Sequence, residues 1–131
     1  MPVLLWTLIE GLSVDEITTL HELDAALGST SERPAFFFKH STACAVSAGA
    51  LRRTNEFLAR SEATGSDLPP CYLIKVIESR PVSSALAQKT GVEHMSPQIL
   101  LVDQGRAAWH TSHFDINAES IEKVLEVRAA K

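Results

Sequence analysis

The sequence lacks most of the motifs from which a function is usually inferred. Its 131 residues include only two cysteines, Cys44 and Cys71, which are too few for a disulfide scaffold. They form neither a CxxC pair nor a zinc-ribbon spacing, and no P-loop or GxGxxG motif occurs. A basic run is also absent and the net charge is −4, so nothing favours a nucleic-acid partner.

Long hydrophobic runs are missing too, because no apolar stretch approaches the ~18 residues that a membrane span needs. The N-terminal "MPVLLWTLIEGL" is apolar but has no basic segment before it and reaches Glu10 early, so we interpret it as structure rather than a signal peptide. This favours a cytoplasmic location, where free thiols are the norm. The length suits a single domain over 1–131, with 1–15 as an N-terminal extension or edge strand.

Short apolar runs predict the strands of a central sheet. Each is rich in β-branched or aromatic residues and is bounded by proline, glycine or polar residues. These runs are 35–39, 71–78 and 97–103. A turn at Gln104-Gly105 then predicts an antiparallel partner over 106–110.

Helical patterns separate these runs. Thr19 and Glu22 fit a capping box, although Ser13 and Glu16 offer a second one, so the start of the first helix stays open. Gly28 is suited to end that helix. The remaining helices are predicted from about Cys44 to Arg60, over 81–90 with Gly91 as its cap, and from a cap at Asn117 onward.

The order of elements predicts an α/β fold. Strands and helices alternate in the first half, which implies parallel strands joined by right-handed crossovers. The second half adds antiparallel strands. We therefore expect a thioredoxin-like three-layer α/β/α sandwich with a central mixed sheet.

Cys44 follows the first predicted strand at the start of a helix, where ligands bind in such sheets. Unpaired backbone N–H groups and the helix dipole at this position favour a thiolate. Lys39 and His40 would add positive potential, unless Lys39 extends its amine to solvent. Ser41, Thr42 and Ser47 would donate hydrogen bonds. The alternative is that Cys44 is an inert, small apolar residue closing a turn.

Cys71 opens a predicted buried strand and should lie at the opposite edge of the sheet. At ~3.3 Å per residue, the two cysteines would be on the order of 20 Å apart. A disulfide needs Cα atoms within about 7 Å. Cys71 is therefore predicted to be a core residue, and Cys44 has no resolving cysteine in this chain.

Four separated motifs carry a family resemblance: "FKHSTACAVS", "ESRPVS", "GVEHMSPQ" and "WHTSHFDI". In that order they resemble the monothiol bacilliredoxins, thioredoxin-like redox proteins of the bacillithiol system. The match runs from about Thr19 to Leu125. The family pattern at the site is usually "KHSTxCPIS", so Ala45 replaces a proline and Val46 an isoleucine.

The resemblance implies a monothiol thiol–disulfide oxidoreductase. Cys44 would remove bacillithiol or a similar low-molecular-weight thiol from S-thiolated client proteins, and Ser47 cannot close an internal disulfide. The small thiol is a co-substrate and no bound cofactor is expected. A second small thiol or a reductase would free Cys44. Pro97 would be a cis-proline, the backbone of Ser96 and Pro97 would pair with an extended substrate, and His94 would line the substrate groove.

Other interpretations stay open at this stage. A CGFS-type monothiol glutaredoxin, which binds an iron–sulfur cluster with glutathione, shares the cysteine and the serine three residues on, but Ala45-Val46 replaces its Gly-Phe. A thiol peroxidase would carry a proline where Phe37 stands. His110 and His113 are weak evidence for a metal site without a third ligand, so none is expected.

Overall fold

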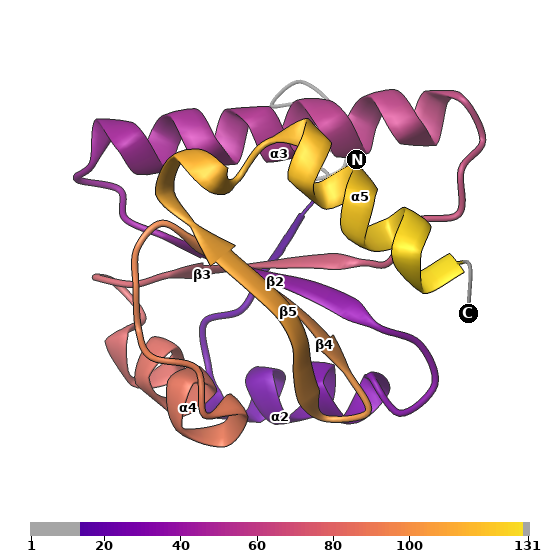
Figure 1. The fold of residues 1–131 in the computed structure, drawn as a ribbon. Coiled ribbons are helices and arrows are strands. Elements are labelled where there is room, and N and C mark those ends of the chain that lie inside the picture. Colours follow the sequence, from indigo (N-terminus) through magenta and orange to yellow (C-terminus); the bar gives the residue numbers. More distant parts are fainter. Residues whose placement is uncertain (1–13, 130–131) are drawn as a thin grey trace, which may run out of the picture.

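The computed structural model describes residues 14–129 and shows a five-stranded mixed sheet (Figure 1). The strand order is β1-β3-β2-β4-β5. β1 and β2 both run parallel to β3, whereas β4 is antiparallel to β2 and to β5. The strands are β1 (Asp15–Glu16), β2 (Ala35–His40), β3 (Cys71–Lys75), β4 (Gln98–Asp103) and β5 (Arg106–Ser112). The predicted edge strand within the first dozen residues lies outside the described residues.

Helices cover both faces of the sheet, as Figure 1 shows, so the predicted α/β/α sandwich is confirmed. One face carries α3 (Ala45–Ala63) and α5 (Ala118–Ala129), and the other carries α2 (Leu20–Ser29) and α4 (Arg80–Thr90). A short 3₁₀ turn, η1 (His113–Asp115), joins β5 to α5. Within residues 14–129, no helix is both long and apolar enough to cross a membrane.

The central strand β2 is buried at all six positions, as its continuous apolar run predicted. Successive side chains alternate between the two faces. Phe36 and Phe38 pack in the core beneath α3 and α5, and Ala35 and Phe37 pack in the core beneath α2 and α4. Full burial of a phenylalanine stabilises a fold by about 1.5–3 kcal/mol, so β2 is a rigid base for the loop that follows it.

The first helix begins where the Thr19 capping box predicted. Thr19 Oγ1 accepts from the Glu22 N–H at 3.0 Å, and the Glu22 carboxylate accepts from the Thr19 N–H at 3.1 Å. The alternative start at Ser13 is excluded because Glu16 lies in β1. The helix runs one residue past Gly28, to Ser29.

The other helices and strands begin and end within a few residues of the predicted positions. The predicted strand 71–78 ends at Lys75 and gives way to a turn, and β5 continues beyond 110 to Ser112. Gly91 caps α4 with a φ of 73°, a left-handed conformation that glycine adopts without strain. Asn117 Oδ1 accepts from the Ser120 N–H at 2.9 Å, which confirms its capping role.

Candidate active site

Four connecting segments meet at one edge of the sheet. The parallel strands β2 and β3 both end there, at His40 and Lys75, which are register partners. β4 begins at the same edge and β5 ends there, since Gln98 pairs with Ser112. The segment 41–44, the turn 76–79, the loop 91–97 and η1 are therefore neighbours. This is the edge at which sheets of this kind bind ligands.

Cys44 occupies the N-cap of α3 at this edge, as predicted. Its backbone is extended, with φ −127° and ψ 123°, and the Ala48 N–H donates to its carbonyl at 3.1 Å. The side chain is partly exposed, makes no capping hydrogen bond and belongs to no disulfide. The first turn of α3 itself contains no acidic residue that would oppose the positive end of the helix dipole. The sulfur is therefore held by neither a disulfide nor a capping bond.

Ser47 holds the segment that carries Cys44. Its hydroxyl is fully buried, lies 2.7 Å from His40 Nδ1 and accepts from the Ser41 N–H at 2.9 Å. A hydroxyl that accepts from Ser41 and donates to an unprotonated Nδ1 satisfies three polar groups at once. The predicted supporting residues Ser41 and Ser47 therefore act on the loop, and neither bonds the sulfur directly.

His40 is a neutral hydrogen-bonding partner in this arrangement. Burial lowers the pKa of His40; the charge of Glu78 opposes that shift and the charge of Lys75 adds to it. A lowered pKa favours the uncharged ring at neutral pH. The expectation that His40 adds positive potential is accordingly wrong, because desolvation disfavours the imidazolium.

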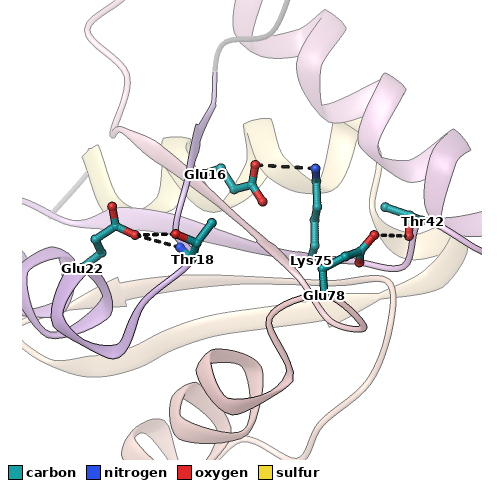
Figure 2. A network of polar contacts seen from close by, with 6 residues as sticks. All are labelled: Glu16, Thr18, Glu22, Thr42, Lys75 and Glu78. Carbon is teal, nitrogen blue, oxygen red and sulfur yellow. Dashed lines mark hydrogen bonds and ion pairs between the residues drawn. The ribbon is translucent and has the colours of Figure 1, made fainter.

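The hydroxyl of Thr42 also bonds a residue other than Cys44. It donates to the Glu78 carboxylate at 2.8 Å and ties the Cys44 segment to the turn after β3 (Figure 2). Lys75, on the neighbouring strand, forms an ion pair with Glu16 at 3.5 Å in the same view. No pattern in the sequence predicts the Thr42–Glu78 contact, whose partners lie 36 residues apart.

Lys39 does not reach solvent. Its side chain is 1% exposed, and its amine has no hydrogen-bond partner among the described residues. The alternation along β2 places it on the α4 face, opposite to His40. Burial lowers the pKa of Lys39 to about 8, so the amine still carries its charge at neutral pH. The alternative in which Lys39 extends to solvent is excluded.

The peptide bond between Ser96 and Pro97 is cis, as the resemblance implied. The Pro97 carbonyl already accepts from the His113 N–H at 3.1 Å, and proline has no N–H. Pro97 was expected to pair with a substrate through its backbone. Its carbonyl is already occupied by this internal bond, so it has little left to offer a substrate. The backbone N–H and C=O of Ser96 have no partner among the described residues.

His94 lies exposed on the loop before Pro97. Its Nδ1 is 3.5 Å from Ser83 Oγ on α4. Burial lowers the pKa of His94, and the positive charges of Lys39 and Arg80 lower it further. His94 therefore lies beside two cations, Lys39 and Arg80, on the α4 face, and its own ring is uncharged at neutral pH.

Cys71 is a core residue, as predicted. It is 3% exposed and pairs with Phe36 at the opposite end of β2 from Cys44. Burial, followed by the charge of Asp15, raises the pKa of the Cys71 thiol to about 12, which keeps it protonated. Between residues 14 and 129, no cluster of three metal-ligating side chains occurs, so His110 and His113 gain no third ligand.

The comparisons with known proteins identify the family and the fold. The family model of the monothiol bacilliredoxin BrxC matches residues 15–121. The chain belongs to the monothiol bacilliredoxin family. In this family the site departs from the usual pattern at Ala45, which is the first residue of α3 and is exposed.

Solved structures show the same fold. A structure described as an inferred oxidoreductase with a thioredoxin fold is 26% identical, with a TM-score of 0.75, and the match covers 86% of this chain and 94% of that one. The thioredoxin of Fasciola hepatica is 10% identical, with a TM-score of 0.65 and coverages of 87% and 98%. Thioredoxin NaTrxh from Nicotiana alata is 18% identical, with a TM-score of 0.66 and coverages of 88% and 92%. This bacilliredoxin is therefore a thioredoxin-fold protein of thiol redox chemistry.

Proposed function

We propose that this protein is a monothiol oxidoreductase that removes bacillithiol, or a similar low-molecular-weight thiol, from mixed disulfides on client proteins. The observation that supports this proposal most strongly is the position of Cys44, a partly exposed free cysteine at the N-cap of α3. The only other cysteine is buried at the far end of the sheet, so it cannot resolve a disulfide on Cys44. A reduced resting thiol suits the cytoplasm.

The exchange conserves electrons at each step. The Cys44 thiolate attacks the small-thiol sulfur of the client's mixed disulfide. A new disulfide forms between Cys44 and the small thiol, and the client leaves as a thiolate that takes up a proton. A second small-thiol thiolate then attacks the small-thiol sulfur of that adduct, releasing the symmetric small-molecule disulfide and the Cys44 thiolate. A separate dithiol reductase is the alternative route of release.

The residues around Cys44 have supporting roles in this proposal. The bonds from Ser47 to His40 and Ser41 fix the segment before the cysteine. The first N–H groups of α3 would interact favourably with negative charge that develops on the sulfur during exchange, while Lys39 keeps its unneutralised charge on the opposite face of the sheet. The free backbone groups of Ser96 would pair with an extended client segment, as a strand adds to a sheet edge.

Mass spectrometry tests the proposal directly. A client protein carrying bacillithiol or glutathione on one cysteine is mixed with the reduced protein, and both are analysed intact after acid quenching. We expect a small-thiol adduct on Cys44 together with the client in its reduced form. Transfer of the whole client onto Cys44, or no adduct at all, would contradict the proposed direction of attack.

Two cysteine variants serve as controls. Cys44→Ser should lose the transfer completely, because serine is not a nucleophile toward disulfides under these conditions. Cys71→Ser should retain it, since the Cys71 thiol is buried and protonated. Equal loss in both variants would show that folding, and not the nucleophile, had been removed.

A further inference from the structure

A corner on the α4 side of the active edge brings together two cations, Arg80 and Lys39, and the His94 ring, and we call it the cationic corner. Arg80 is the first residue of α4, His94 lies on the loop before Pro97, and Lys39 is the penultimate residue of β2. Arg80 and Ser83 are three residues apart, so they share one face of α4. Ser83 contacts the His94 ring at 3.5 Å, which brings Arg80 and His94 together at the surface.

Lys39 lies beneath this surface. Its register partner on β4 is Gln98, whose side chain holds the loop above it. Gln98 Nε2 donates to the Glu93 carbonyl at 3.0 Å, and the Met95 N–H donates to Gln98 Oε1 at 3.4 Å. These two hydrogen bonds hold the loop that carries His94 above the Lys39 amine. The nitrogen of that amine has no hydrogen-bond partner among the described residues.

The described part of the chain gives this corner no acidic partner. None of the ion pairs formed between residues 14–129 involves Lys39 or Arg80. The first turn of α4 contains no acidic residue either. Glu78 bonds Thr42, and neither Glu78 nor Glu93 is among the charges that act on the His94 ring. In a chain with a net charge of −4, this local excess of positive charge is an exception.

We propose that Arg80, His94 and the N-terminus of α4 form a carboxylate-binding subsite for the small thiol, with Lys39 as a buried charge behind it. The inference rests on the proposed function and adds the residues that would bind a carboxylate of the small thiol. Such a subsite holds the carboxylate of the small thiol at one side of the active edge while the sulfur of the same molecule meets Cys44. An unpartnered buried cation gains most from a counter-ion at this position, because the low local dielectric strengthens their attraction.

A charge series of small thiols tests the subsite through the reaction itself. Cys44 in a Cys71→Ser background is first converted to its thionitrobenzoate mixed disulfide. An attacking probe thiolate forms a disulfide with Cys44, and the coloured thionitrobenzoate anion leaves with the electron pair. Rates are measured with mercaptopropionate and with neutral mercaptoethanol. Each rate is then divided by the rate at which the same thiol attacks a small-molecule disulfide. The ratio of the two normalised rates reports anion preference alone.

Arg80→Gln should lower this ratio by about two- to fivefold, the range expected for one exposed charge pair. Lys89→Gln is the matched control, because it removes one positive charge from the last turn of the same helix. Its ratio should equal that of the parent. An equal ratio in Arg80→Gln and the parent would overturn the subsite, whereas failure of the neutral thiol to react would count against the proposed function instead.

A second measurement is independent of exchange at Cys44. The Cys44→Ser protein is titrated with succinate at constant ionic strength while the histidine ring signals are followed by NMR. We expect a saturable shift of the His94 signals that Arg80→Gln weakens and Lys89→Gln leaves unchanged, with His21 and His110 unaffected. No shift at His94, or the same shift in Arg80→Gln, would overturn the proposal.

Discussion

Ser47 Oγ lies 2.7 Å from His40 Nδ1, and this bond joins the end of β2 to the first turn of α3. The same oxygen accepts from the Ser41 N–H at 2.9 Å. Both side chains are buried, so water is a poor substitute for either partner. Ser47, three residues after Cys44, therefore has a structural role: it holds the short segment that leads into Cys44.

Replacing Ser47 by alanine should destabilise the protein by about 1–3 kcal/mol, because the Ser41 N–H and the His40 ring lose their shared partner. Exchange at Cys44 should slow as well, since the segment before it is no longer held. Urea unfolding and the alkylation rate of Cys44 measure the two effects.

Ser84→Ala is the matched control for this change. Ser84 is an exposed helical serine on α4, so its loss should stay within about 0.5 kcal/mol. A Ser47→Ala protein as stable as the Ser84→Ala protein would show that the buried hydroxyl contributes nothing.

The His40 ring makes stability depend on pH in the acid range. Burial lowers its folded-state pKa below the unfolded value of about 6.5, so its contribution is fully present above about pH 6.5 and is lost as the pH falls through the lower folded value. His40→Gln removes that dependence. The stability advantage of the parent over His40→Gln should therefore shrink between about pH 7 and about pH 5 in urea unfolding. An advantage that grew toward acid pH would mean that the folded ring is charged.

The sequence predicted the elements of this fold because their signals are local. The apolar run of β2, the Thr19–Glu22 capping box and the Gln104-Gly105 turn each depend on residues that are close in the chain. The position of Cys44 at a helix start followed from the same kind of signal. The family resemblance then identified Pro97, whose cis bond no local pattern reveals.

The partners of the site residues were not predictable, because they depend on packing between distant segments. Thr42 meets Glu78 only because the ends of β2 and β3 are neighbours. The alternation along β2 fixes the face of Lys39, but not the loop that Gln98 holds above its amine. Expected contacts with the thiol therefore turned out to be contacts within the scaffold.

The buried Lys39 amine should reduce stability at neutral pH. Its pKa is about 8 in the folded protein and about 10.4 in the unfolded chain, so the stability of the parent rises with pH between these values. Lys39→Met should be more stable than the parent near neutral pH, and this gain should shrink by about 2 kcal/mol on raising the pH to about 9.5. Urea unfolding of both proteins at the two pH values measures it.

Lys89→Met is the control, because the Lys89 side chain is 47% exposed and pairs with Asp24 at the surface. Its stability relative to the parent should change little over the same pH range. A Lys39→Met protein that is less stable than the parent at neutral pH would mean that the amine has an anionic partner after all.

Ala45 marks the departure from the family pattern, and the backbone around it already suits proline. Cys44, with φ −127° and ψ 123°, has the extended conformation that a residue before proline adopts. Ala45 is the first residue of α3, where a missing N–H breaks no helical bond. Ala45→Pro should consequently fold normally and gain about 0.4–1 kcal/mol, because the unfolded chain loses freedom.

The same change should lower the reactivity of Cys44. Proline removes one of the unpaired N–H groups at the start of α3, and each such donor favours the thiolate. The loss of one hydrogen bond corresponds to about a two- to tenfold slower alkylation at slightly acid pH. Ala45→Gly keeps the N–H and should retain the parent rate while losing stability. If Ala45→Pro reacts as fast as Ala45→Gly, the N–H of residue 45 does not face the sulfur, and the thiolate depends on the remaining donors of the helix.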